Sequence, residues 1–362
     1  FGPLTLKDVD PPEPPGDDWV RVRPRLSGIC GSDLATIDGK SSRYFEPIVS
    51  FPFTPGHEVV GELDDGARVA VVPVLNCAVR GIDPPCHMCE DGRINLCERT
   101  AFGCIEPGLQ SGFCESTGGG WSTAMVAHRS QLVPIPDDLS DEAAVLVEPT
   151  ACAVHAARQT SGGLVAVIGS GALGLLTIAA LDAIDPGTRE GTRIVATAKH
   201  PDQRYWAKVL GADVVCAPGE LDRVVRTMTG SMVLDGGQLS CGIDTVVDCV
   251  GSEQSLTQAL RVVAPGGDVF AVGMPGVTTL DLTPLWHREV SLRGVYAYDH
   301  HPDQTDDFAA AIDLIREKDL GRLVSATYPL SRYEDAIEHA ANAGVRGAVK
   351  IAFDLRDERE RN

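Results

Sequence analysis

The pattern of apolar and polar residues changes character near residue 150. Before that point, short β-branched runs alternate with Gly- and Pro-rich turns, as at residues 19–23 and 67–72. Such runs predict an irregular region of short β-strands. Beyond it, as far as residue 294, apolar strand-like runs alternate with helical patterns. This alternation predicts a parallel sheet that helices cover on both faces.

The second region has well-separated elements. Its strands are predicted at residues 164–168, 193–198, 244–249, 269–272 and 290–295. Its helices are predicted from Ala172 onward, through Leu210, and at residues 253–263. The tail adds helices at 306–318 and 333–343, a strand at 348–353 and a charged end at 356–362 that we expect to fray. We therefore predict two domains, one of residues 1–150 with 295–362 and one of residues 151–294.

Composition narrows the class of protein. The 362 residues are 43% hydrophobic and carry a formal net charge of -20, with no basic cluster, which argues against a nucleic-acid partner. The most apolar stretch, residues 164–184, is interrupted by glycines and is not expected to span a membrane. The 11 cysteines are concentrated before residue 115. In a chain of this length they favour metal ligation in a reducing, cytoplasmic compartment.

A glycine-rich loop joins the first predicted strand and helix of the second region. Gly169 permits a tight turn, Gly171 lets the backbone approach a pyrophosphate, and Gly174 lets the helix pack on the strand. The helix N-terminus then presents free N–H groups to phosphates. The loop predicts a dinucleotide site made of Gly169, Ser170, Gly171, Ala172, Leu173 and Gly174.

The next predicted strand bears on the choice of dinucleotide. An Asp or Glu at its end would bind the ribose 2′-OH of NAD, but Ala198 occupies that position. Lys199, His200 and Arg204 follow, and their positive charge suits a 2′-phosphate. We therefore predict NADP in preference to NAD. The alternative is that Lys199 and His200 are exposed loop residues with no ligand role.

Two short motifs of the first region carry metal-ligand chemistry. Gly-Ile-Cys30-Gly-Ser-Asp offers a thiolate, and Gly-His57-Glu58 offers an imidazole and a carboxylate. A third acid, Glu148, lies just before the second region. A catalytic zinc takes three protein ligands and keeps a fourth position open. We predict such a zinc on Cys30 and His57, with an acid, Glu148 or Glu58, as the third contact.

A second cysteine cluster has different spacing. Cys86, Cys89 and Cys97 form a C-x2-C-x7-C pattern, which favours a closed structural zinc site. We favour Cys77 as its fourth ligand because thiolate suits zinc. The other candidates for that position are Asp83 and Cys104. Free or redox-active cysteines are the competing interpretation of the whole cluster.

Together these motifs resemble the medium-chain dehydrogenase/reductase superfamily, specifically its zinc-containing polyol, threonine and glucose dehydrogenase branch. The resemblance covers nearly the whole chain and implies a GroES-like irregular β catalytic domain and a Rossmann doubly wound parallel sheet. It also implies an NAD(P)-dependent zinc alcohol dehydrogenase. It rests on Gly-Ile-Cys30-Gly-Ser-Asp33, Pro55-Gly-His57-Glu58-Val-Val-Gly61, the Cys86/Cys89/Cys97 lobe, Glu148-Pro149, the Gly169–Gly174 loop and Val247-Asp-Cys-Val-Gly251.

The resemblance also implies roles for single residues. Glu148 matches an acid that contacts the metal directly or through water, and is therefore preferred as the resting contact. Glu58 resembles an acid that approaches the metal during turnover. Ser32 resembles the hydroxyl that relays the substrate proton, and Asp33 the acid that orients the ligand histidine. Many members have a histidine where this chain has Ala35. The relay must therefore end in water, a cofactor ribose hydroxyl or another side chain.

One further departure concerns the cysteine lobe. The family usually spaces its four cysteines two, two and seven residues apart, whereas residues 78–85 expand the first interval here. This expansion leaves the choice of the fourth ligand open.

The expected function is hydride transfer between an alcohol and NADP or NAD, with a polyol, sugar or hydroxy amino acid as substrate. Two alternatives are a non-catalytic zinc- and dinucleotide-binding protein and a zinc-free quinone or enoyl reductase on the same fold. The intact ligand set argues against the second, and Ser32 with Asp33 favours catalysis over the first. We expect a homodimer or homotetramer. Candidates for lining a substrate pocket are His287, Tyr296, Tyr298, His300 and His301.

Overall fold

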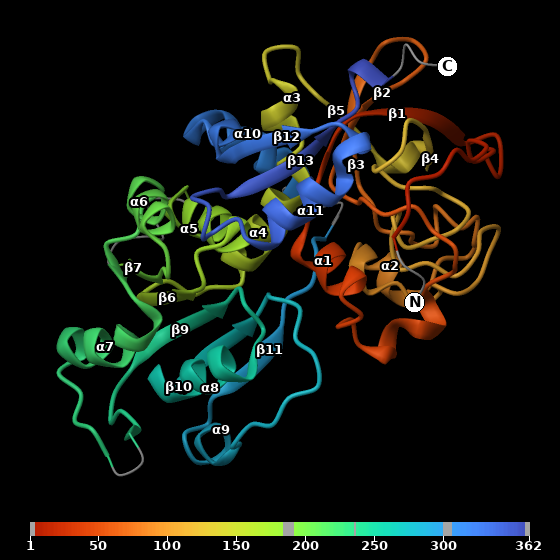
Figure 1. The fold of residues 1–362 in the computed structure, drawn as a ribbon. Helices are drawn as coiled ribbons and strands as arrows, with labels where there is room; N and C mark the ends of the chain where they lie inside the picture. The colour runs from red at the N-terminus through yellow and green to blue at the C-terminus, as the bar shows by residue number, and fades with distance from the viewer. Residues whose placement is uncertain (1–3, 184–191, 235–236, 300–305, 359–362) are drawn as a thin grey trace. The chain divides into compact units, whose positions relative to one another are not determined.

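The structure, a computed structural model, describes residues 4–183, 192–234, 237–299 and 306–358. The chain divides into two compact units. Unit 1 comprises Phe1–Ala151 and Tyr298–Asn362, and unit 2 comprises Cys152–Ala297. The helix α4 (Val147–Arg158) carries the chain from unit 1 into unit 2 (Figure 1). Within the described ranges, every helix is too short or too polar to cross a membrane.

Unit 2 is built on one parallel sheet of six strands. Their order is β11-β10-β9-β6-β7-β8, and each neighbouring pair is parallel. Because strand order reverses beside β6, the sheet is doubly wound, as the alternation of strands and helices predicted. The strands are β6 (Leu164–Ile168), β7 (Arg193–Thr197), β8 (Val214–Cys216), β9 (Ile243–Asp248), β10 (Val263–Ala271) and β11 (Ser291–Gly294).

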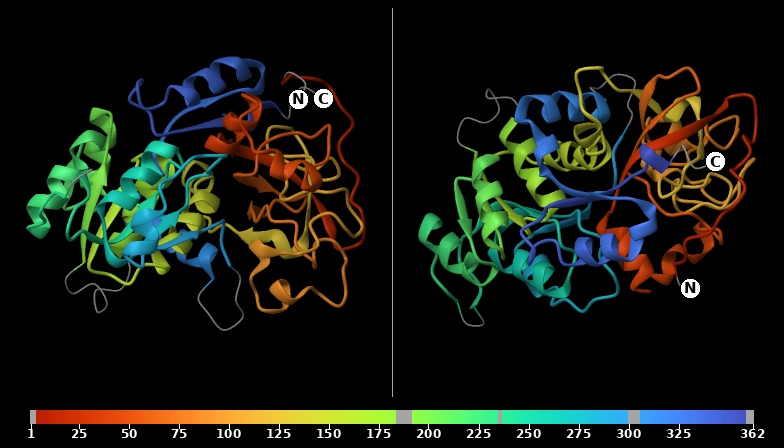
Figure 2. Two further views of the ribbon diagram at one scale, coloured as in Figure 1. Left: turned by 90° about the horizontal axis from the view of Figure 1, so that it is seen from below. Right: turned by 45° about the horizontal axis from the view of Figure 1, so that its top comes forward.

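Helices of unit 2 fall into two groups. α5 packs on β6 and β7 and contacts α6, whereas α8 packs on β9 and β10 and contacts α7 and α9. The views of Figure 2 show the two groups on opposite sides of the strands. A fully apolar cluster that includes Ile168, Val195 and Val246 fills the interior. The helices are α5 (Ala172–Ala183), α6 (Pro201–Val209), α7 (Leu221–Thr229), α8 (Glu253–Val262) and α9 (Thr283–His287), with a short 3-10 helix η4 (Pro218–Glu220).

The sequence analysis did not predict β8, α7 or the five-residue α9 of unit 2. β8 has three residues, too few for an alternation to be recognised. α7 has Leu221, Val224, Val225 and Met228 at the spacing of one helix face, and all four pack on the core, so its signal was present and was missed. The strands and helices that were predicted in this unit are confirmed to within a few residues, except that β10 begins at Val263 rather than at Val269.

Unit 1 is built on a mixed sheet, antiparallel except for one parallel pair at its edge, and organised around its long first strand. The first half of β1 pairs with β4, and its second half pairs with β2 and β13. Inward-facing aliphatic residues such as Val22, Val59 and Val69 pack with Met125 beneath it. The strands are β1 (Trp19–Gly28), β2 (Val59–Glu62), β3 (Arg68–Val71), β4 (Met125–His128), β5 (Leu132–Pro134), β12 (Val324–Tyr328) and β13 (Lys350–Asp354).

The helices of unit 1 that precede α4 are short, in keeping with the irregular region predicted, and the two helices predicted at 306–318 and 333–343 are confirmed. The α-helices are α1 (Gly31–Ile37), α2 (His87–Glu90), α3 (Asp141–Ala144), α10 (Asp307–Lys318) and α11 (Tyr333–Ala341). The 3-10 helices are η1 (Arg43–Ile48), η2 (Ile94–Leu96), η3 (Arg129–Gln131), η6 (Leu320–Leu323) and η7 (Leu330–Arg332).

Buried Asp141 ties the C-terminal segment to the sheet of unit 1. It forms ion pairs with Arg25, Arg68 and Arg356 at 2.8, 3.0 and 3.5 Å. Arg356 also pairs with Asp354 at 2.6 Å. The expectation that the tail frays from residue 356 is therefore wrong for Arg356, which this network holds; residues 359–362 lie outside the described part of the chain.

Candidate metal centres and cofactor loop

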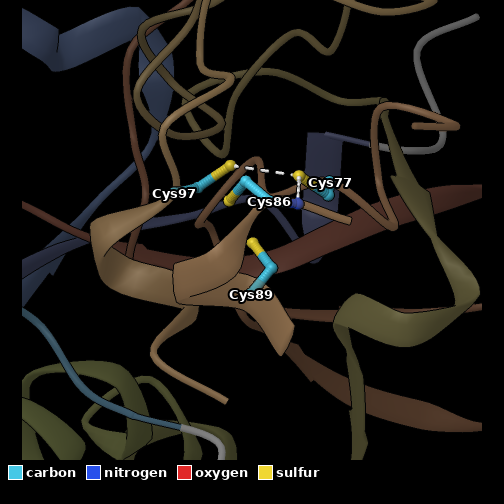
Figure 3. A group of neighbouring side chains, drawn as sticks. All are labelled: Cys77, Cys86, Cys89 and Cys97. Carbon is cyan, nitrogen blue, oxygen red and sulfur yellow. Dashed lines mark hydrogen bonds between the residues drawn. The ribbon is translucent and has the colours of Figure 1, made fainter. Parts of the chain in front are cut away.

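Four cysteines of unit 1 converge on one point. The sulfur atoms of Cys77, Cys86, Cys89 and Cys97 all lie within 4.8 Å of one another and face a common space (Figure 3). Cys77 Sγ and Cys97 Sγ are 3.7 Å apart. Tetrahedral zinc with Zn–S bonds of about 2.3 Å separates its sulfur ligands by about 3.8 Å, so the group fits zinc. Asp83 and Cys104, the other candidates for the fourth ligand, are not members of this group.

Backbone amides surround these sulfur atoms. The N–H of Cys86 donates to Cys77 Sγ at 3.3 Å, and the N–H of Glu98 donates to Cys86 Sγ at 3.4 Å. Although burial opposes ionisation, the amides of Glu98 and Cys89 and the thiols of Cys89 and Cys77 lower the pKa of Cys86 to about 7. Burial raises the pKa of Cys97 to about 11. Four thiols this close do not ionise together without a cation, which supports a metal at this point.

A second group joins a thiol, an imidazole and a carboxylate. Ligand atoms of Cys30, His57 and Glu58 lie within 4.8 Å of one another. Cys30 is the N-cap of α1, and its N–H donates to Asp33 Oδ2 at 2.9 Å. Asp33 Oδ1 lies 3.3 Å from His57 Nδ1. Asp33 therefore orients both groups and leaves His57 Nε2 for a metal, so the donor set fits zinc.

The charge around His57 is concentrated and buried. Burial disfavours the imidazolium, but the Asp33 carboxylate and the Cys30 thiol together raise the pKa of His57 well above its usual value. His57 and Asp33 are almost fully buried. Gly56 before the imidazole has φ +99°, and a side chain there would collide with Trp121. Packing against Trp121 therefore requires glycine at residue 56, directly before the metal-binding candidates His57 and Glu58.

Glu58 is paired with a cation that the sequence analysis missed. Lys350 on β13 forms a buried ion pair with Glu58 Oε2, and the two side chains are 3% and 1% exposed. Burial works against the ammonium, but Glu58, with Cys30 and Asp33, raises the pKa of Lys350. A lone lysine in the apolar strand predicted at 348–353 was the available signal, because lysine is rarely buried without a partner.

Other predicted residues lie in different settings. Glu148, in the first turn of α4, is buried but is not a member of the group formed by Cys30, His57 and Glu58. Ser32 and Ala35 lie on α1, both partly exposed. His300 and His301 lie outside the described residues. Tyr298 is buried and its ring packs edge-on against Phe308.

The glycine-rich loop of unit 2 has three distinct geometries. Gly169 has φ +92°, and a side chain there would strike Val250. A side chain at Gly171 would meet nothing within 4 Å, so the backbone is open to a ligand. A side chain at Gly174 would collide with the Gly169 carbonyl, where α5 packs on the loop. This cradle fits a pyrophosphate. Ser170 Oγ donates to the Thr197 carbonyl at 2.9 Å and anchors the loop to β7.

The end of β7 carries positive charge and no carboxylate. Ala198 is buried, Lys199 is exposed and His200 is the N-cap of α6. The amides of Lys199 and His200 both donate to Gln203 Oε1, at 3.2 and 3.3 Å. Arg204 Nε donates to the Ala198 carbonyl at 3.1 Å, which holds its guanidinium beside the end of the strand.

Comparisons with known proteins agree with this arrangement. The family model for the alcohol dehydrogenase GroES-like domain matches residues 16–137, and the zinc-binding dehydrogenase model matches residues 172–317. A sorbitol dehydrogenase from Arabidopsis thaliana is 30% identical over 98% of this chain and 91% of its own. An L-idonate 5-dehydrogenase from Vitis vinifera is 29% identical over 93% and 88%. The 2R,3R-butanediol dehydrogenase structure from Bacillus subtilis is 25% identical, with a TM-score of 0.70 over 97% and 96%.

The fold, the two ligand clusters and these matches define a class of enzyme. The chain belongs to the zinc-containing medium-chain dehydrogenase/reductase superfamily, in its sorbitol and L-idonate dehydrogenase-like branch. It is an NAD(P)-dependent zinc alcohol dehydrogenase, with a GroES-like first region and a Rossmann sheet. The resemblance drawn from the sequence motifs is therefore confirmed.

Proposed function

We propose that this enzyme oxidises a secondary alcohol of a polyol or a related sugar derivative and passes the hydride to NADP. The group formed by Cys30, His57 and Glu58, with Asp33 behind it, carries the proposal. Its ligands are mixed and few, as a catalytic zinc requires. The names of the curated relatives, sorbitol dehydrogenase and L-idonate 5-dehydrogenase, support the substrate class.

The side chains of unit 1 have separate tasks in this proposal. Cys30 and His57 hold the zinc with an acid, Glu148 or Glu58. When bound, zinc supplies a Lewis acid that eases loss of the alcohol proton. Ser32 accepts that proton and passes it on, and Ala35 leaves the next step to water, a ribose hydroxyl or another side chain.

Residues of unit 2 hold the dinucleotide. The loop from Gly169 to Gly174 binds the pyrophosphate at the N-terminus of α5. Lys199, His200 and Arg204 would hold the 2′-phosphate of NADP, since Arg204 lies beside the end of β7, and Ala198 stands in place of the acid that would repel it. The cofactor supplies the hydride chemistry, and the protein supplies its position. We assign residues 1–150 with 295–362 to catalysis and residues 151–294 to the cofactor.

A second substrate class is favoured by a run of aromatic rings. Phe51 is exposed, and its ring centroid lies 5.0 Å from that of Phe53. The ring centroids of Phe53 and Phe113 are 5.2 Å apart. The ring centroids of Phe113 and His57 are 5.9 Å apart. The rings therefore lead from the surface to a zinc ligand. An alcohol with an aryl or alkyl substituent would bury apolar area there, whereas a polyol would not.

Assembly and location complete the proposal. We expect a homodimer or homotetramer, because the sheet of unit 2 ends at β11 and large apolar side chains near that end are exposed. Val277, Leu282 and Trp286 are 100%, 54% and 78% exposed. Light scattering of the purified protein measures the assembly. A cytoplasmic location is proposed from the free cysteines.

The deciding experiment is a substrate panel with both cofactors. Initial rates are measured for sorbitol, L-idonate, butane-2,3-diol and 1-phenylethanol, each with NADP and with NAD. We expect oxidation of one or more polyols and a higher kcat/KM with NADP. Preference for 1-phenylethanol, lost in Phe113→Ala but retained in the surface variant Phe102→Ala, would support the aromatic class instead. No oxidation of any alcohol would contradict the proposed function.

A further inference from the structure

Lys350 and Glu58 form an ion pair in the interior of unit 1, beside the proposed zinc ligands. Their side chains are 3% and 1% exposed. Removing two charges from water is costly, and a buried pair is weak evidence for stability on its own. An ion pair of this kind beside a metal site is therefore better explained by its effect on how the ligands bind the metal.

The backbone around the pair is shaped to admit it. Gly28, the last residue of β1, donates its N–H to the Glu58 carbonyl at 2.9 Å. A side chain at Gly28 would collide with Glu58 Oε2 and Lys350 Cε. Trp121 Nε1 donates to the Gly28 carbonyl at 3.2 Å and fixes the glycine from the other side. The absence of a side chain at Gly28 therefore leaves room for the carboxylate and the ammonium where β1, β13 and the segment before β2 meet.

Glu58 lies within reach of two cations. Its carboxylate belongs to the same 4.8 Å group as Cys30 and His57, and its Oε2 is paired with Lys350. A zinc held by Cys30 and His57 would compete with the ammonium for this carboxylate. If Glu58 and Glu148 both bound the metal with Cys30 and His57, four protein ligands would close the site to substrate.

We propose that Lys350 is a positioning residue that holds the Glu58 carboxylate on its ammonium group and so keeps one coordination position of the catalytic zinc open. This inference rests on the proposed function, since it assumes zinc on Cys30 and His57 with Glu148 as the third ligand. The positive charge of Lys350 also opposes tight zinc binding, so the enzyme retains an open site at some cost in metal affinity.

The test compares variants of the zinc-loaded enzyme by the rate of zinc release to a chelator. Lys350→Met removes the charge at similar length, and we expect release from the catalytic site to become about ten-fold slower as Glu58 binds the metal. Lys350→Arg keeps the charge and should release zinc at close to the wild-type rate. Lys350→Met with Glu58→Gln should lose the slowing. Lys40→Met, which removes an exposed lysine, is the matched control.

A Co²⁺-substituted enzyme gives a spectroscopic readout of the same change. The visible absorption of Co²⁺ depends on the number and kind of its ligands, so Lys350→Met should shift the spectrum and the shift should vanish in the double variant. If Lys350→Met does not fold, Glu58→Gln alone decides the matter. Unchanged zinc release in Glu58→Gln supports the inference, because Glu58 is then not a resting ligand; about ten-fold faster release overturns it.

The remaining outcomes separate this inference from the proposed function. Slow release and an altered spectrum in Lys350→Met, both reversed in the double variant, support the inference. Unchanged or faster release with an unchanged spectrum makes Lys350 a structural residue and overturns it. If Cys30→Ser binds as much zinc as the wild type, zinc does not bind at Cys30 and the proposed function itself fails.

Discussion

The two ligand clusters of unit 1 differ in how the chain builds them. Cys77, Cys86, Cys89 and Cys97 come from one segment, offer only sulfur and receive N–H donors from their own loop. The Cys30, His57 and Glu58 group draws on separate segments, offers three kinds of donor and adjoins a buried lysine. The first cluster can fill all four coordination positions of a zinc ion, whereas the second leaves its coordination incomplete. One site suits folding and the other suits reaction.

The difference also concerns the groups behind the ligands. At the four-cysteine cluster the supporting groups are backbone amides, which cannot move or change charge. At the mixed group, formed by Cys30, His57 and Glu58, the supporting groups are side chains of opposite charge. Asp33 lies beside His57, and Lys350 is paired with Glu58. The mixed group is therefore adjustable by substitution in both directions, toward tighter and toward weaker metal binding.

The largest expected effect is loss of the four-cysteine site. Cys86→Ser removes one sulfur ligand and should lower Tm by about 10 °C or more, because structural zinc contributes directly to folding. Thermal unfolding followed by circular dichroism measures it. Cys104→Ser is the control, since Cys104 lies in the same lobe outside the cluster. Equal Tm values for Cys86→Ser and Cys104→Ser would contradict a structural role for the four-cysteine cluster.

A smaller effect is expected where the mixed group loses its orienting acid. Asp33→Asn keeps the three donors but weakens the hold on His57, and should cost about 10- to 100-fold in zinc affinity or kcat/KM. Tm should change little by comparison with Cys86→Ser. Metal titration and initial rates measure the two quantities. Wild-type values for both would mean that Asp33 does not orient the ligand.

A change outside both clusters should leave the metal content alone. Ala198→Asp places a carboxylate where the 2′-phosphate of NADP is proposed to bind. We expect kcat/KM with NADP to fall by about ten-fold or more, with NAD less affected, because charged hydrogen bonds contribute about 1.5–3 kcal/mol. Zinc per chain should equal that of the wild type. An unchanged cofactor ratio would contradict the assignment of Lys199, His200 and Arg204.

The smallest effect is a difference in pH dependence. Zinc displaces protons from its ligands, so affinity for both sites should rise with pH. At the mixed group the raised pKa of His57 means that a proton must leave at neutral pH. At the four-cysteine cluster more thiol protons must leave, and the pKa of Cys97 is about 11. The four-cysteine cluster should therefore show the steeper rise, measured by zinc titration at several pH values; equal slopes would count against the comparison.

What the sequence revealed in advance follows from how local each feature is. The strands and helices of unit 2 and the Cys86, Cys89 and Cys97 spacing are contiguous patterns, and the motif order was enough to identify the superfamily. Because residues 78–85 lengthen the first interval, spacing alone could not exclude Asp83 as the fourth ligand. In the structure it is Cys77 that lies beside the other sulfur atoms.

Features that depend on tertiary packing were not accessible. The pairing of Lys350 with Glu58 joins segments far apart in the chain, and only the fold brings β13 beside β1. Phe113 came close to His57 through a loop with no periodic signal. The preference for Glu148 over Glu58 as the zinc ligand stays a prediction, and it is Glu58 that the structure groups with Cys30 and His57.

The central claim, that two zinc sites have separate roles, is tested most directly by counting zinc in Cys30→Ser and in the wild type while measuring alcohol oxidation. The account predicts about two zinc ions per wild-type chain. Cys30→Ser should retain the one at the four-cysteine cluster, keep a Tm close to that of the wild type, and lose alcohol oxidation. A Cys30→Ser variant that still binds both ions, or that oxidises the alcohol at the wild-type rate, would contradict the account.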